Sequence, residues 1–118
     1  MSKTVHPVQF KKEISGNQGI SMVRFCSEKD LNCRSLNSYF SQLESYYQAY
    51  MRFYTINTDL NRQMVREFNI HDLPAILLFR NGVVVDHFSG KDPVAGFHSR
   101  ISELLKSKRT MKRELMLL

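Results

Sequence analysis

An Asn-Gly pair between two apolar, β-prone runs places the strongest constraint on the fold of this chain. The pair is Asn81 and Gly82, with Ala75 to Phe79 before it and Val83 to Phe88 after it. Asn-Gly is the typical sequence of a tight two-residue turn, because both positions of such a turn need positive φ. The two runs are therefore predicted to form an antiparallel hairpin.

Short β-prone runs alternate with helical segments along the rest of the chain. The longest stretch without Gly or Pro, Leu31 to Met51, carries apolar residues at helical spacing and is predicted to be one helix with Asp30 at its N-cap. Ile20 to Cys26 is apolar and β-prone except at Arg24, which predicts a mostly buried central strand. The other expected elements are a strand and a short helical turn over 4–10, a loop through Gly16 and Gly19, a strand over 51–58, a helix over 59–68, and a last helix from Asp92 and Pro93 through Leu105.

Length and cysteine content narrow the class of protein. With 118 residues and two cysteines, the chain has the size of one domain and lacks a disulfide framework. Its apolar runs are far shorter than the ~20 residues of a membrane-spanning helix, and its first residues lack the apolar core of a signal peptide. We expect an α/β domain over 1–106 with a central mixed sheet and helices on both faces, then a tail over 107–118. No membrane association is expected, and the expected location is cytoplasmic, with the nucleus as an alternative.

Positive charge is concentrated at the C-terminal end. The chain has 17 Lys and Arg against 11 Asp and Glu, and between Ser99 and Leu118 six basic residues outweigh two acidic ones, so +4 of the net +6 lies there. The nearly neutral body is not expected to bind nucleic acid. Leu104, Met111 and Leu118 recur every seven residues, which favours docking of the tail on a partner or on a second copy of the chain. A frayed terminus is the other interpretation.

Several motifs, in order, resemble the thioredoxin family. VRFCSEKDLNCR at 23–34 aligns without gaps with the strand, loop and helix that end in Trp-Cys-Gly-Pro-Cys-Lys in that family. INTD at 56–59 resembles its third strand, and FNIHDLPAILLFRNGVVV at 68–85 resembles its proline loop and hairpin. The resemblance extends from about Val5 to Leu105. It implies a thioredoxin fold with a sheet of about five strands.

The same alignment shows that three parts of the family's redox chemistry are replaced. Asp-Leu-Asn-Cys at 30–33 stands where Cys-Gly-Pro-Cys is expected, so Asp30 takes the place of the nucleophile and Cys33 alone remains. Lys29 replaces the tryptophan, and Arg24 replaces the buried acid of the second strand. A dithiol cycle cannot run on this motif. The charge of Asp30 would also raise the pKa of a nearby Cys33 thiol.

The role of Cys33 has three interpretations. It is a small buried apolar residue, a monothiol nucleophile, or one half of a disulfide with Cys26 if their Cα atoms lie within ~7 Å. The four histidines lack zinc-like spacing to the cysteines, so no metal and no other cofactor is expected.

Pro74 aligns with the cis-proline of the family, so the resemblance implies a cis Leu73–Pro74 bond and a groove that pairs with an extended peptide. The expected function is a non-catalytic protein-binding or assembly module. The alternative is a monothiol thiol-disulfide oxidoreductase or isomerase that uses Cys33. The residues expected to form the groove are Asp30, Leu31, Asn32, Cys33, Leu73, Pro74, Ser89 and Gly90.

Arg24 is unusual within an apolar strand, because a buried guanidinium without a partner is costly. It must be paired or reach solvent. The candidate partners are Asp59, Asp72 and Asp86.

Overall fold

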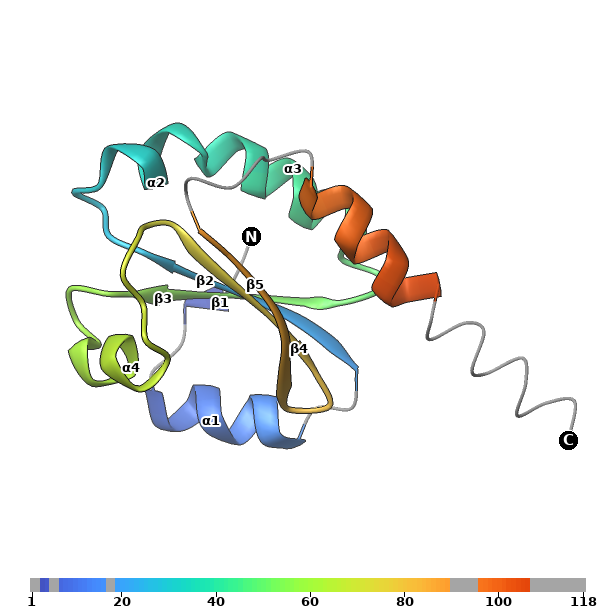
Figure 1. Cartoon of the computed structure of the whole chain (residues 1–118), viewed down its shortest axis with the longest axis horizontal. Helices are drawn as coiled ribbons and strands as arrows, with labels where there is room; N and C mark the ends of the chain where they lie inside the picture. The colour runs from blue at the N-terminus through green and yellow to red at the C-terminus, as the bar shows by residue number, and fades with distance from the viewer. Residues whose placement is uncertain (1–2, 5–6, 17–18, 90–95, 107–118) are drawn as a thin grey trace, which may run out of the picture.

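The computed structural model describes residues 3–4, 7–16, 19–89 and 96–106 (Figure 1). Helices lie on both sides of a central sheet, with α1 and α4 on one side and α2, α3 and the C-terminal helix on the other. The elements are β1 (Lys3–Thr4), α1 (Pro7–Gly16), β2 (Ile20–Cys26), α2 (Leu31–Ser35), α3 (Asn37–Tyr47), β3 (Arg52–Asn57), α4 (Arg62–Glu67), β4 (Ala75–Arg80), β5 (Val83–Ser89) and a C-terminal helix over 96–106.

The sheet is mixed, as predicted, and its strand order is β1-β3-β2-β4-β5. Strands β1, β3 and β2 are parallel, whereas β4 pairs antiparallel with both β2 and β5. The two-residue β1 is the shortest strand. Strand β2 lies in the middle, as its nearly continuous apolar sequence predicts.

The predicted hairpin is confirmed. Arg80 pairs with Val83 across the turn, and Asn81 and Gly82 have φ of 51° and 82°. The backbone N–H of Asn81 also donates to the carbonyl of Gly19 at 3.0 Å, which ties the turn to the segment before β2. One irregularity in the pairing of β4 and β5 lies between Leu78 and Phe79.

The alternation of side chains along the strands divides the core into two layers. Val23 and Phe25 of β2 pack with Phe10 of α1 and Met64 of α4. Met22 of β2 belongs to the other layer, with Ile76 and Leu78 of β4, Leu43 of α3 and Ile101 of the C-terminal helix. Burying one such side chain stabilises the fold by about 1.5–3 kcal/mol. The two layers together hold the sheet between its helices.

The single helix predicted over 31–51 is wrong, because the structure has two helices there. They meet at Leu36, whose φ and ψ are −96° and 0°. The Ser35 hydroxyl donates to the carbonyl of Asn32 at 3.1 Å, and the Leu36 N–H reaches the carbonyls of both Asn32 and Arg34. A serine hydroxyl that bonds back to the preceding turn bends a helix. Helix α3 ends at Tyr47, before the predicted end at Met51.

Two other boundaries differ from the prediction. Helix α1 continues through Gly16, where a loop was expected, because Phe10 and Ile14 are four residues apart and both bury against the sheet. Helix α4 begins at Arg62 rather than at residue 59. The side chain of Asn57 accepts from the N–H of Asp59 at 2.9 Å, and this local bond keeps the segment in a turn.

Asp92 and Pro93, the predicted start of the last helix, lie outside the described residues, as does the tail over 107–118. Within the described ranges, no helix combines the length and apolar character needed to cross a membrane.

Candidate functional site

Three strand ends meet at one edge of the sheet. Because β4 is antiparallel to both of its neighbours, its first residue lies beside the last residues of β2 and β5. The register pairs Phe25 with Ala75 and Ala75 with Ser89. Cys26 pairs with Asn57 on the parallel side. Pro74, which directly precedes Ala75, is thereby placed at the same edge as Cys26 and Ser89.

The chain leaves this edge after β2 and turns into α2 at Asp30. The Asp30 backbone is extended, with φ −81° and ψ 127°, and its carboxylate accepts from the N–H of Cys33 at 2.9 Å. The N–H of Asp30 donates to the carbonyl of Ser27 at 3.2 Å, which closes the turn. The N-cap role predicted for Asp30 is confirmed.

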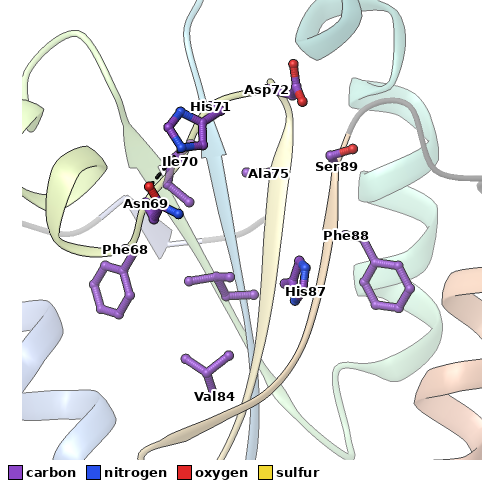
Figure 2. A pocket seen from close by; sticks show the side chains of 11 residues that line it. Phe68, Asn69, Ile70, His71, Asp72, Ala75, Val84, His87, Phe88 and Ser89 are labelled. Atoms are coloured by element: carbon purple, nitrogen blue, oxygen red, sulfur yellow. Dashed lines mark hydrogen bonds between the residues drawn. The ribbon is translucent and has the colours of Figure 1, made fainter.

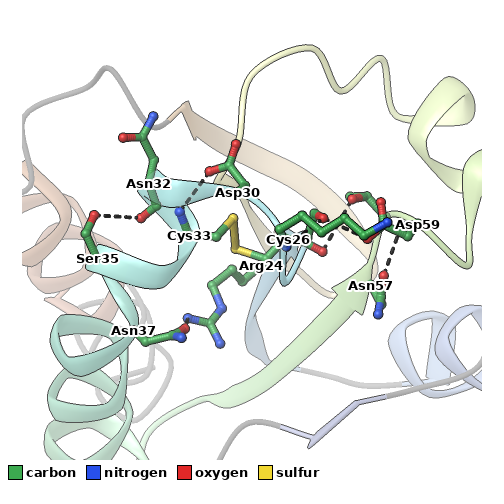
Figure 3. The surroundings of a disulfide bond; sticks show 12 residues. Arg24, Cys26, Asp30, Asn32, Cys33, Ser35, Asn37, Asn57 and Asp59 are labelled. Carbon is green, nitrogen blue, oxygen red and sulfur yellow. Dashed lines mark hydrogen bonds between the residues drawn. A yellow bond between two sulfur atoms is a disulfide. The ribbon is translucent and has the colours of Figure 1, made fainter.

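Cys26 and Cys33 form a disulfide, with Cα atoms 5.8 Å apart (Figure 3). The bond joins the end of β2 to the first turn of α2, across the loop that ends at Asp30, the N-cap of α2. Cys33 is 3% exposed, whereas Cys26 is half-buried. Of the three interpretations of Cys33, the structure shows the disulfide, so the interpretation of Cys33 as an unbonded apolar residue is wrong for this state. The spacing of seven residues alone does not predict this disulfide, because the turn between the two cysteines brings them close together.

Arg24 lies on the same face of β2 as Cys26, two residues before it. Its Nη1 donates to Oδ1 of Asn37 at 3.1 Å, and its Cζ lies 5.1 Å from the centre of the Phe40 ring. Burial lowers the pKa of this guanidinium, and the negative charge of Glu44 opposes that shift. Its hydrogen bond therefore goes to Asn37, and the acidic side chain that acts on its charge is Glu44.

Two of the aspartates suggested by the sequence have other partners. Asp59 accepts from the Ser27 hydroxyl at 2.7 Å, and Asp86 pairs with Arg100. Ser27 also accepts from the N–H of Lys29 at 3.2 Å, so it orders the turn between Cys26 and Asp30. The sequence offered no signal for Ser27, because its role depends on a residue 32 positions away.

A pocket of about 230 Å³ opens beside the disulfide, on the side of β3, α2 and α3. We call it the Arg24 pocket. Two arginines, one glutamate and both cysteines contribute to its wall, together with neutral polar side chains. Its lining residues are Arg24, Cys26, Ser27, Glu28, Cys33, Arg34, Asn37, Thr55 and Asn57.

A second, larger pocket of about 550 Å³ lies between the segment after α4 and strand β5 (Figure 2). Its apolar lining includes Phe68, Leu77 and Val84. Asp72 and Ser89 lie where the pocket meets the edge of the sheet. His71, another lining residue, shares a hydrogen bond of 2.8 Å with the side chain of Asn69.

The structure brings most of the predicted groove residues to this edge. Leu31 is 76% exposed and Asn32 is exposed, while Leu73 and Ser89 are half-buried. Pro74 is fully buried, and the Leu73–Pro74 bond is cis. Gly90 lies outside the described residues. Among the residues that the structure describes, no group of three or more His, Cys, Asp or Glu is placed to hold a metal ion.

Comparison with known proteins adds the family context. A sequence model described as Thioredoxin matches residues 1–103. The chain is similar to a thioredoxin of Porphyra purpurea, at 25% identity over 101 residues that cover 86% of this chain and 94% of that protein. It is 28% identical to a thioredoxin of Rickettsia conorii over 82 residues, which cover 70% of this chain and 78% of that protein. The crystal structure of Malassezia sympodialis thioredoxin is similar in fold, with a TM-score of 0.78, 20% identity, and coverage of 89% of this chain and 91% of that chain.

Proposed function

This chain belongs to the thioredoxin family, and we propose that it acts as a protein-binding module rather than as a dithiol oxidoreductase of the Cys-x-x-Cys type. One observation carries the proposal. The position of the family's nucleophile is occupied by the carboxylate of Asp30, which caps α2 through the N–H of Cys33. A carboxylate cannot exchange with a disulfide, so the first step of the dithiol cycle has no nucleophile there.

The remaining cysteine of the motif is also poorly placed for attack. The sulfur of Cys33 is bonded to Cys26, and its side chain is 3% exposed. A nucleophilic thiol has to be accessible and ionised. Cys33 meets neither condition in this state.

The binding surface in this proposal is the edge formed by Leu31, Leu73 and Ser89 beside the buried Pro74. An extended peptide that runs past the start of β4 would pair with the backbone next to Pro74. Leu31 adds an apolar side chain that is 76% exposed. Covering it with a bound peptide contributes about 1–2 kcal/mol to affinity.

We further propose that the protein acts in the cytoplasm. The tail over 107–118 would be a second contact, for a partner or for another copy of the chain.

The catalytic half of the proposal is tested by the reduction of insulin disulfides in the presence of dithiothreitol. The native chain is expected to leave the rate at its background value. The matched variant, Asp30→Cys combined with Cys26→Ala, restores Cys-x-x-Cys and is expected to accelerate the reaction. If the native chain accelerates it and Cys33→Ala removes the effect, the proposal is wrong.

The binding half is tested with reduced, carboxymethylated insulin B chain as an extended peptide that lacks thiols. Amide chemical shifts of the isotope-labelled protein are expected to change at Leu31, Leu73 and Ala75, and to saturate. Leu31→Ala should weaken binding, whereas Leu60→Ala, at a site 79% exposed on another loop, should not. No saturable change at these amides would contradict the proposal.

The second candidate is thiol-disulfide exchange by Cys33 alone, after the bond to Cys26 has been reduced; the bond shows that the Cys33 sulfur can pair with another sulfur. This candidate needs Cys26 to be dispensable. In the insulin assay the Cys26→Ala variant would then be active and the Cys26→Ala, Cys33→Ala variant inactive. Equal background rates for both variants would exclude it.

A further inference from the structure

We propose that the Arg24 pocket is a site where Cys26 exchanges disulfides with a small anionic disulfide or thiol that carries carboxylates. This site lies on the face of β2 that carries Arg24 and Cys26, and it does not depend on peptide binding beside Pro74. In this chemistry the entering sulfur bonds to Cys26, which lies outside the segment at 30–33 that aligns with the Cys-x-x-Cys motif of the family.

The accessibility of the two sulfurs decides which one exchanges with an outside molecule. Both cysteines line the pocket, but Cys26 is half-buried and Cys33 is 3% exposed. Cys26, the more exposed residue of the two, is therefore assigned to the incoming sulfur, and Cys33 is assigned as its internal partner. Exchange requires access to the attacked sulfur along with an ionised attacking thiol.

The volume and charge of the pocket limit what enters it. About 230 Å³ is below the ~300–1,000 Å³ of typical drug-sized ligand sites, so it fits a small molecule or one end of it. Arg24 and Arg34 line it against one acid, Glu28. A guanidinium binds a carboxylate through two parallel hydrogen bonds. The pocket thus favours an anionic disulfide over a cationic one.

Arg24 is held in place before any ligand arrives. Its hydrogen bond to Asn37 and its position over the Phe40 ring restrain the guanidinium. A group that is already ordered loses less conformational entropy on binding. Arg24 and Cys26 line the same pocket, so a carboxylate held by the guanidinium lies beside the disulfide.

The reaction balances in two exchanges. In the reduced protein the Cys26 thiolate attacks the small disulfide RSSR, which forms a Cys26–S–S–R mixed disulfide and releases one RS⁻. The Cys33 thiolate then attacks the sulfur of Cys26, which forms the Cys26–Cys33 bond and releases the second RS⁻. The protein loses two electrons and RSSR gains them, while the two protons of the dithiol pass to solvent or to the two released thiolates. Excess reduced thiol drives the same steps backward.

The test compares oxidised glutathione, which is anionic, with cystamine, which is cationic, as the small disulfide. The full chain is reduced, freed of reductant, mixed with either reagent, quenched by alkylation at set times and mapped by mass spectrometry. The native chain is expected to pass through a mixed disulfide at Cys26 and to end with the Cys26–Cys33 bond. Cys33→Ser is expected to accumulate glutathione on Cys26.

The charge dependence is measured on variants of the pocket. Arg24→Gln is expected to slow the reaction with oxidised glutathione about tenfold, the fold-change of one lost hydrogen bond to a charged group. The same variant is expected to leave the cystamine reaction unchanged or faster. Arg52→Gln removes an equal charge at an exposed site paired with Ser21, at the other end of β2, and is expected to change neither rate.

Three results would overturn the proposal: a first mixed disulfide at Cys33, a native Cys26 that stays unmodified, or equal slowing of both reagents in Arg24→Gln. If Arg24→Gln does not fold, Arg34→Gln takes its place. Arg34 is an exposed residue of α2 that lines the same pocket, and its loss is expected to slow glutathione exchange selectively by a smaller factor. Unselective slowing there would overturn the proposal in the same way.

Discussion

The two faces of strand β2 differ in what surrounds them. On one face, Val23 and Phe25 are fully buried in the layer beneath α1 and α4. On the other, Met22 is buried, but Arg24 and Cys26 border a polar pocket. Residues that are adjacent in this strand therefore have different surroundings and different roles. The apolar face carries the stability of the thioredoxin fold, and the face toward α2 carries the disulfide and the Arg24 pocket.

The largest effect is expected on the apolar face. Phe25→Ala leaves a cavity among Met64, Phe68 and Ala75 and should lower the free energy of unfolding by about 3–5 kcal/mol. Denaturation by urea, followed by circular dichroism, measures the loss. Leu60→Ala, at an exposed site, should stay within about 0.5 kcal/mol of the native chain. A loss of less than about 1 kcal/mol in Phe25→Ala would contradict the division between the two faces.

Reduction of the disulfide should give the next largest effect, on the other face. The bond closes a loop between residues seven apart, and a loop of this length stabilises the folded state by about 2 kcal/mol through the entropy of the unfolded chain. Urea denaturation with and without dithiothreitol measures the difference. In the Cys26→Ala, Cys33→Ala variant the reductant should have no effect. A native chain whose midpoint ignores the reductant would show that the pair adds nothing to stability.

These two effects also show how far the sequence predicts this molecule. The hairpin, the central strand and the N-cap at Asp30 were predicted because each depends on residues close together in the chain. The break in the 31–51 helix at Leu36 was not predicted. Serine also occurs within uninterrupted helices, so the sequence does not show that the Ser35 hydroxyl bonds to the carbonyl of Asn32.

The site was harder to predict than the fold. Arg24 contacts Asn37 and Phe40, which lie on α3, 13 or more positions away in the chain. Only the packing of α3 on the sheet brings these residues to Arg24. The sequence suggested Asp59, Asp72 or Asp86 because a carboxylate neutralises a charge. The hydrogen bond of this guanidinium goes to an amide instead, and the carboxylate that acts on its charge is Glu44. The disulfide likewise depends on the turn between Ser27 and Asp30, whose hydrogen bonds involve Asp59.

A smaller effect is expected at Asp30, the N-cap of α2, which lies between Cys26 and Cys33 in the chain. Asp30→Ala removes the acceptor of the Cys33 N–H and should destabilise the protein by about 1 kcal/mol. Asp30→Asn keeps an acceptor and should cost less. Glu28→Ala removes a charge from the same turn without removing the cap, so its unfolding midpoint should stay near that of the native chain. An equal loss in Glu28→Ala would assign the effect to charge instead of capping.

The smallest effect is a dependence on alkaline pH from the helical layer over this face. Burial, followed by the neighbouring Tyr47, raises the pKa of Tyr39. The unfolded chain therefore ionises Tyr39 at lower pH than the folded chain does. Stability should be unaffected by this group below its ordinary pKa and should decrease as pH rises above it. The difference in unfolding free energy between neutral and strongly alkaline solution should be smaller in Tyr39→Phe. An identical pH profile in the variant would contradict the assignment.

The hairpin turn at Asn81 and Gly82 has a practical consequence. It lies at the opposite end of the sheet from Cys26 and Pro74, because β4 runs away from that edge and β5 returns to it. A fluorophore or an affinity handle attached at the exposed Asn81 would therefore leave both proposed sites accessible. The same turn offers a point for immobilising the protein on a sensor surface with both proposed sites directed toward solution.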